Sequence, residues 1–107
     1  MRNPMQTLWL NPMFIQWVRS GKKRSTVRIG DRKIDPGPLE FKSQEEGVLV
    51  TVTRVDRKTF GELDMEDARD DGFDDLEGFK KILRQIYPEL KEDSVLTVVR
   101  FEYREDS

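Results

Sequence analysis

The side chains best suited to chemistry lie in one short segment, Gly21-Lys22-Lys23-Arg24-Ser25-Thr26-Val27-Arg28. A threonine hydroxyl can attack a carbonyl carbon when a neighbouring base takes its proton. Lys23 can serve as that base if burial or nearby cations disfavour its charged form. The cations can also pair with phosphate groups, and an arginine plane can stack on a nucleobase. The segment therefore predicts a site for a phosphate, a nucleobase or an amide.

The composition excludes several kinds of catalytic site, because the chain contains no cysteine and no histidine. Disulfides, thiol nucleophiles, the usual zinc sites and every serine–histidine arrangement are ruled out. Any chemistry has to use Lys, Thr, Ser, Tyr, Asp or Glu side chains. We expect neither a metal nor a cofactor in this protein.

Length and charge suggest one small domain with a local basic face. The 107 residues are the size of a single compact domain, expected to span 1–107. Nineteen basic and 21 acidic residues give a formal net charge of -2, yet basic residues crowd positions 19–33. Such a face suits a local contact with nucleic acid. The chain shows no membrane-spanning run and no signal peptide, so we expect a soluble, cytoplasmic protein that is a monomer.

A helix over residues 11–20 and a strand over residues 25–29 must position the chemistry-bearing segment. Asn11 is a suitable N-cap, and Pro12 fits the first helical position because no N–H is needed there. Gly21 ends the helix, since glycine adopts the left-handed conformation without a Cβ clash. A hydroxyl and several cations are therefore expected at a helix-to-strand corner.

Apolar residues at regular spacing predict the core. The first helix is expected to bury Phe14, Trp17 and Val18, and Ile15 widens this face. Trp9 precedes this helix; we favour core packing for it, with a stacking platform for a base as the alternative. A later stripe at helical spacing is expected to be core and not a binding groove; its members are Leu76, Phe79, Ile82, Leu83 and Ile86.

The same patterns predict the remaining elements and the fold class. Strands are expected over residues 6–10, 39–42, 48–55 and 95–103, and side chains of the last strand are expected to alternate between its two faces. Helices are expected over residues 64–71, with Asp64 as the N-cap, and over residues 75–86. The strand alternation slips near Arg54, which predicts a β-bulge. The order of elements predicts an α+β fold: a small, curled β-barrel of about five or six mostly antiparallel strands with two or three helices packed on it.

The ordered set of motifs resembles the ASCH domain family, whose members adopt a PUA-like β-barrel. The resemblance begins at Ser20-Gly21-Lys22-Lys23 and Thr26-Val27-Arg28. It continues through the Pro-Gly turn and strand at residues 36–41, the valine strand, Thr59-Phe60-Gly61-Glu62-Leu63, residues 68–73, Ile86-Tyr87-Pro88 and the closing strand through Phe101. Nearly the whole chain from about Leu8 is covered.

Within that family, the chain is most similar to small stand-alone members, some of which are amidohydrolases that remove the acetyl group from 4-acetylcytidine. Their site has a lysine after the glycine, a threonine three residues on, and a later glutamate. Lys23 and Thr26 match the first two positions. Asp71 is the nearest counterpart of the glutamate and would act as a proton shuttle or orient Lys23, with Asp70 as a second candidate. Other ASCH proteins look like RNA-binding modules or have been linked to RNA cleavage.

The sequence leaves four functions open. The first is an RNA- or nucleotide-binding domain that holds one base in a cleft; its binding residues would be Lys22, Lys23, Arg24, Thr26, Arg28 and Trp9. The second is a metal-free amidohydrolase on 4-acetylcytidine with Lys23, Thr26 and Asp71 as catalytic residues. The third is a ribonuclease that uses Lys23 and Asp71 as acid and base. The fourth is an interaction domain, in which Lys23 and Asp71 would be exposed and paired. For Asp70 we favour a solvated acidic helix end.

Overall fold

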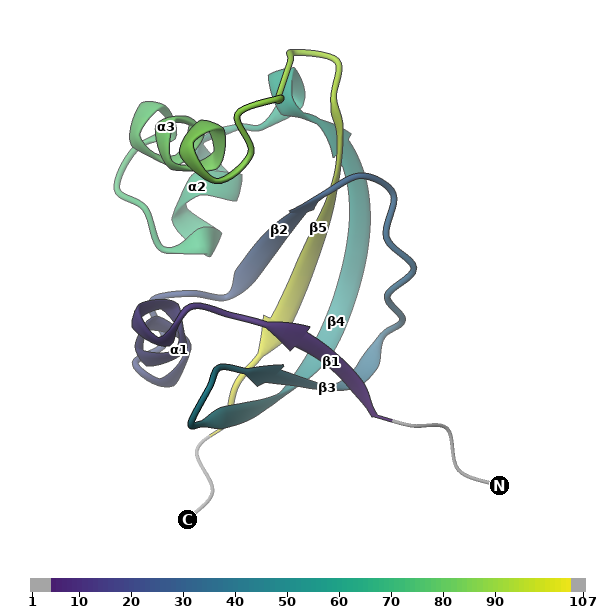
Figure 1. Cartoon of the computed structure of the whole chain (residues 1–107), viewed down its shortest axis with the longest axis vertical. Helices are drawn as coiled ribbons and strands as arrows, with labels where there is room; N and C mark the ends of the chain where they lie inside the picture. The colour runs from purple at the N-terminus through teal and green to yellow at the C-terminus, as the bar shows by residue number, and fades with distance from the viewer. Residues whose placement is uncertain (1–4, 105–107) are drawn as a thin grey trace.

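The protein consists of a strongly curled sheet with three helices beside it (Figure 1). The computed structural model describes residues 5–104, so residues 1–4 and 105–107 of the expected 1–107 domain lie outside the described residues. The elements in chain order are β1 (Gln6–Trp9), α1 (Pro12–Arg19), β2 (Ser25–Ile29), β3 (Gly37–Lys42), β4 (Gly47–Thr59), a 3-10 turn (Phe60–Glu62), α2 (Met65–Asp71), α3 (Leu76–Ile86) and β5 (Val95–Glu102). The predicted α+β class is confirmed.

The five strands lie in the order β1-β3-β4-β5-β2. The β1–β3 pair is parallel, and the three other pairs are antiparallel. The sheet is therefore a half-barrel whose two edge strands, β1 and β2, are not paired with each other. Helix α1 connects these two edges along the chain, and α1 lies on the same side of the sheet as α2 and α3 in Figure 1.

The predicted helix termini are confirmed at the level of individual hydrogen bonds. The Asn11 side chain accepts a hydrogen bond from the Met13 N–H at 2.9 Å, which caps α1. Gly21 follows α1 with φ of 82°. The Asp64 side chain accepts from the Asp67 N–H at 2.9 Å and caps α2. Local interactions therefore determine where α1 and α2 begin and where α1 ends.

Alternate residues of β5 belong to two separate hydrophobic clusters. Val99 and Phe101 pack in the cluster beneath α1, whereas Leu96 and Val98 pack in the cluster beneath α2 and α3. The strand period of two explains this division. In β4 the register shifts between Val52 and Arg54, which confirms the predicted bulge. The extra residue turns Val55 back toward the cluster that contains Val52.

The predicted core of α1 is only partly right. Val18 is buried, but Ile15 is its fully buried partner, while Phe14 and Trp17 are half-buried. The Trp17 ring packs edge-on between Phe14 and Phe73, with centroid distances of 5.0 and 5.4 Å. Only one side of α1 faces the sheet, so the aromatic side chains on its flank contact α2 and the segment after it instead.

Replacing Phe41 by alanine tests the cluster beneath α1. Phe41 is fully buried and packs edge-on against Phe101, with ring centroids 5.0 Å apart. We expect Phe41→Ala to lower the free energy of unfolding by about 3–5 kcal/mol, measured by urea denaturation. The matched control is Leu49→Ala on the neighbouring strand; Leu49 is exposed, so its loss should stay within about 0.5 kcal/mol. Similar losses for both variants would contradict this assignment of the core.

Candidate functional site

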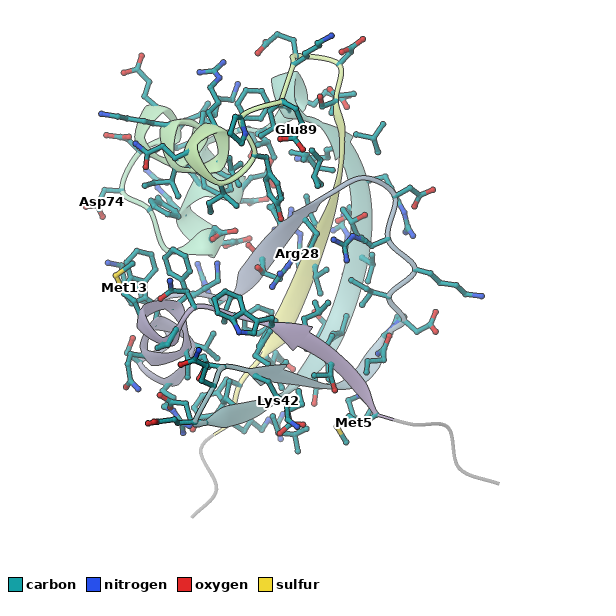
Figure 2. The ribbon with its side chains drawn as sticks, viewed as in Figure 1. Met5, Met13, Arg28, Lys42, Asp74 and Glu89 are labelled. Atoms are coloured by element: carbon teal, nitrogen blue, oxygen red, sulfur yellow. The ribbon has the colours of Figure 1, made fainter. Side chains whose placement is uncertain are left out.

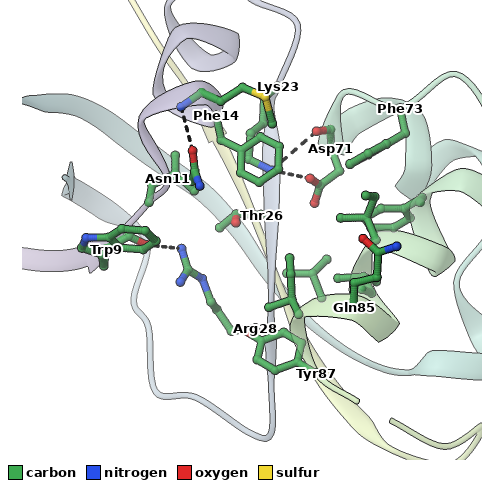
Figure 3. A pocket seen from close by; sticks show the side chains of 17 residues that line it. Trp9, Asn11, Phe14, Lys23, Thr26, Arg28, Asp71, Phe73, Gln85 and Tyr87 are labelled. Atoms are coloured by element: carbon green, nitrogen blue, oxygen red, sulfur yellow. Dashed lines mark hydrogen bonds and ion pairs between the residues drawn. The ribbon is translucent and has the colours of Figure 1, made fainter. Parts of the chain in front are cut away.

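A pocket of about 430 Å³ lies where the edge strands β1 and β2 do not pair, between α1 and α3 (Figure 3). Its volume falls within the range of about 300–1,000 Å³ that holds small molecules. The walls of the pocket are mainly apolar. One of its polar residues, Arg28, lies toward the middle of the molecule in Figure 2. Six polar residues contribute to the lining: Asn11, Lys23, Thr26, Arg28, Asp71 and Gln85.

Backbone hydrogen bonds hold the loop after α1 against the end of α2. The Lys23 N–H donates to the Trp17 carbonyl at 3.0 Å, and the Arg24 N–H donates to the Asp70 carbonyl at 2.6 Å. The Lys23 side chain is thereby directed inward, where its ammonium forms an ion pair with the Asp71 carboxylate. These side chains are 3% and 6% exposed. The exposed Lys23–Asp71 pair expected for an interaction domain is therefore not observed.

The close approach of α2 to α1 requires glycine at position 72. Gly72 has φ of 103°, and a Cβ built there would lie 2.8 Å from a ring carbon of Trp17. A larger residue would therefore push the end of α2 away from α1. Because Asp71 immediately precedes this turn, the same contact fixes the position of its carboxylate in the pocket.

Asp70 faces away from the pocket, which separates it from Asp71. Its carboxylate accepts hydrogen bonds from Arg100 at 2.6 Å and from Arg24 at 3.0 Å. Arg100 also donates to Asp67 at 2.9 Å, so it fastens α2 to β5. The expectation of a solvated helix end is wrong for Asp70, since ion pairs offset the unfavourable helix dipole. Only Asp71 remains as the carboxylate available to the pocket.

Burial shifts the protonation equilibria of the Lys23–Asp71 pair. It lowers the pKa of the Lys23 ammonium, and the Asp71 charge opposes this shift. It raises the pKa of the Asp71 carboxyl, and the Lys23 charge opposes that shift. Both changes favour the neutral forms. Proton transfer within this pair is therefore easier than between an exposed lysine and an exposed aspartate, which is the property a lysine base requires.

Strand β2 supplies two further polar groups to the pocket. Thr26 is almost fully buried and lies between the Lys23–Asp71 pair and Arg28 in Figure 3. The Arg28 Nη2 donates to the Trp9 carbonyl at 2.8 Å, so this side chain bridges the two unpaired sheet edges. Its Nε is buried and has no hydrogen-bond partner among residues 5–104. The bridge takes the place that backbone pairing would have in a closed barrel.

Apolar side chains form the rim and one wall. Trp9 is exposed and lines the pocket, so the predicted core packing is wrong for it. Met13 and Ile86 line the pocket too, and each of these three side chains is more than half exposed. Phe79 is buried as predicted, but it also contributes to the lining together with Ile82, Leu83 and Ile86. The stripe is therefore part core and part pocket wall, and the predicted burial is wrong for Ile86.

Two of the predicted binding residues lie outside the pocket. The Lys22 ammonium lies 4.0 Å from the centroid of the Trp17 ring. Arg24 is exposed and paired with Asp70. Lys23, Thr26, Arg28, Asp71 and Trp9 all line the pocket. The structure thus separates the basic segment into inward-facing and outward-facing side chains.

Sequence reasoning missed several lining residues, among them Asn11, Gln85 and Tyr87. Asn11 was recognised only as a helix cap, although its amide N–H₂ stays available because its oxygen makes the capping bond. Nothing in the sequence indicated that Gln85 would line a pocket, except its position beside the apolar stripe. Within residues 5–104 no group of three or more His, Cys, Asp or Glu side chains could hold a metal ion. Nor does this part of the chain contain a helix with the length and apolarity needed to span a membrane.

Comparison with known proteins assigns the fold. No family model and no curated protein matches the chain. The crystal structure of an ASCH domain from Lactobacillus crispatus JV V101 matches with a TM-score of 0.80 and 14% identity, over 92% of this chain and 79% of that one. The fold is the ASCH fold.

Two further crystal structures share the ASCH fold. The hypothetical protein PH0355 matches with a TM-score of 0.75 and 23% identity, over 94% of this chain and 100% of that one. Protein EF3133 from Enterococcus faecalis V583, described under DUF984, matches with a TM-score of 0.72 and 16% identity, over 96% of this chain and 82% of that one. At these identities the similarity concerns the fold alone.

Substitutions in the Lys23–Asp71 pair test its burial. Asp71→Asn leaves the Lys23 ammonium buried without a counter-charge, so we expect it to lower the free energy of unfolding by about 3–5 kcal/mol. The double variant Lys23→Met/Asp71→Leu should lose much less, because no charge remains to be desolvated. Urea denaturation of the wild-type protein, the single variant and the double variant measures these losses.

The matched control for these variants is Arg19→Met. It breaks the exposed Arg19–Glu46 pair, whose nitrogen and oxygen lie 3.3 Å apart. Its expected cost is about 0–1 kcal/mol. A double variant as unstable as Asp71→Asn would show that the two charges do not share one buried environment.

Proposed function

We propose that this protein binds a single nucleobase, as part of a nucleoside or nucleotide, in the pocket beside Lys23. The observation that carries this proposal is the combination of the exposed Trp9 ring with the amides of Asn11 and Gln85 in one pocket of base-accommodating size. An aromatic ring stacks on the face of a base, and amide groups both donate and accept hydrogen bonds at its edge. The resemblance to RNA-binding ASCH proteins supports the same ligand class.

The distribution of charge favours a short ligand over an extended RNA strand. Cations on the rim would be needed to pair with successive phosphates. The rim instead carries Trp9, Met13 and Ile86, whereas Lys22 and Arg24 are engaged elsewhere. RNA contact through one terminal or unstacked nucleotide remains compatible with this arrangement. Binding should therefore depend weakly on salt.

Binding of cytidine and 4-acetylcytidine tests the proposal. We expect saturable binding by isothermal titration calorimetry, weakened by about 1–3 kcal/mol in Trp9→Ala because the stacking surface is lost. Lys22→Ala serves as the control, since Lys22 lies outside the pocket and should leave the affinity unchanged. Absence of saturable binding by the wild-type protein to either nucleoside, or equal effects of the two substitutions, would remove the proposal.

A second candidate function is metal-free hydrolysis of the acetyl amide of 4-acetylcytidine. The specific observation in its favour is that Lys23, Thr26 and Asp71 line one pocket, with Lys23 buried. Neutral Lys23 would accept the proton of the Thr26 hydroxyl as that oxygen attacks the acetyl carbon. The C–N bond would then break while the Lys23 ammonium returns the proton to the cytosine amine. Water would cleave the acetyl ester on Thr26 and release acetate.

Asp71 would hold Lys23 in place and exchange a proton with it during this cycle. Attack by a water molecule that Lys23 deprotonates is a shorter route to the same products. An interaction domain would have been supported by an exposed Lys23–Asp71 pair, and the pair is buried. A ribonuclease would have to use the same two groups, and no specific feature of the pocket favours it.

The hydrolase candidate predicts release of cytidine and acetate, measured by chromatography. Lys23→Ala and Thr26→Ala should abolish turnover, while Lys22→Ala should retain it. The rate should rise with pH as Lys23 loses its proton. Because burial lowers the pKa of Lys23 below its usual 10.5, the rise should occur at lower pH than for an exposed lysine. Turnover that persists in Lys23→Ala, or a rise only above that value, would contradict this mechanism.

A further inference from the structure

Arg28 places a guanidinium in the pocket wall. The ion pairs among residues 5–104 leave Arg28 without a carboxylate. Its Nη2 donates to a backbone carbonyl, that of Trp9, and its Nε is buried without a partner. The Nε is removed from water, and a buried polar group is costly unless another group compensates it. A bound anion would supply that compensation.

The charges of the lining residues are unevenly distributed along the pocket. At one end Lys23 and Asp71 neutralise each other, so this end carries no net charge. At the other end Arg28 contributes one positive charge, which the Arg32 charge repels and the Asp71 charge attracts from across the pocket. Arg32 lies in the segment after β2, and its Nε donates to the Ile29 carbonyl at 3.4 Å, next to Arg28 along the strand. The Arg28 end therefore attracts anions, whereas the Lys23 end does not.

The spatial order of these groups matches the order of groups in a nucleotide. In Figure 3 Arg28 lies near Trp9 and Tyr87, with Thr26 between Arg28 and the Lys23–Asp71 pair. A nucleoside monophosphate carries a base and a phosphate on opposite sides of its ribose. With the face of the base on Trp9 and its edge directed toward Lys23 and Asp71, the ribose and phosphate would lie at the Arg28 end. The planar guanidinium suits two phosphate oxygens.

We propose that Arg28 binds the phosphate of a nucleoside monophosphate, so that the pocket prefers a nucleotide to the corresponding nucleoside. This proposal rests on the base-binding function proposed above and adds the ligand class. It assigns the anion site to Arg28, in place of Lys22 and Arg24 of the basic segment. The ligand is a free monophosphate or a terminal nucleotide, since both present the same phosphate.

Isothermal titration calorimetry tests the proposal with cytidine, cytidine 5′-monophosphate, cytidine 3′-monophosphate and inorganic phosphate. Charge-assisted hydrogen bonds predict that the wild-type protein binds one monophosphate at least about 10-fold more tightly than cytidine. Arg28→Met should reduce this preference to about 2-fold or less. Arg28→Lys keeps the charge without the planar fork and should retain an intermediate preference. A dinucleotide that ends in the preferred monophosphate should bind as tightly as the free monophosphate if the natural ligand is the end of an RNA.

The matched control is Arg19→Met, because Arg19 is exposed and paired with Glu46. It should keep the full preference for the monophosphate. Circular dichroism establishes that each variant is folded, and Arg28→Lys gives the decisive comparison if Arg28→Met does not fold.

The outcomes separate this proposal from the proposed function. Equal affinity of the wild-type protein for cytidine and for both monophosphates overturns the phosphate site and leaves base binding intact. Absence of binding to all three nucleoside ligands overturns the base-binding function itself. Binding of inorganic phosphate as tight as that of the monophosphates would show an anion site that needs no base, which also contradicts the proposal. An unchanged preference in both Arg28 variants would place the phosphate elsewhere.

Discussion

The buried ion pair between Lys23 and Asp71 is the interaction on which the arrangement of the pocket depends. It joins the loop after α1 to the end of α2 across 48 residues of sequence. A buried pair is seldom a good source of stability, because desolvation of both ions offsets their attraction. Apolar side chains of similar size could fill the same space without that cost. A pair beside a pocket, with both pKa values shifted toward neutrality, would suit the proton transfer of the proposed hydrolysis better than it suits stability.

The open side of the sheet is what places this pair in the wall of a pocket. In a closed barrel β1 and β2 would pair and fill the space with their own side chains. Here α1 joins these strands and prevents their direct contact, and Arg28 spans the gap through the Trp9 carbonyl. The unpaired edges thus remain short and partly covered, which protects them from pairing with other chains. The same gap becomes the pocket.

The sequence predicted those features that depend on local interactions. The caps at Asn11 and Asp64, the bulge near Arg54 and the alternation along β5 all follow from spacing within a few residues, and the structure confirms them. The exposure of Trp9 could not be predicted, because it depends on which strand pairs with β1. The distinction between Asp70 and Asp71 depends on Arg100, a residue 30 positions further along the chain. Burial of Lys23 likewise results from the packing of α2 against α1, which no local pattern encodes.

The dual use of the α3 stripe shows why periodicity alone could not separate core from site. Phe79 and Leu83 are buried against the sheet, yet they also form the floor of the pocket with their exposed neighbour Ile86. An apolar face of a helix indicates only that water is excluded from it. Either a protein segment or a ligand can exclude water. The polar groups opposite this face decide between the two. Because the Lys23–Asp71 end is neutral and the Arg28 end is cationic, the space between them suits an uncharged ring joined to an anion better than another apolar side chain.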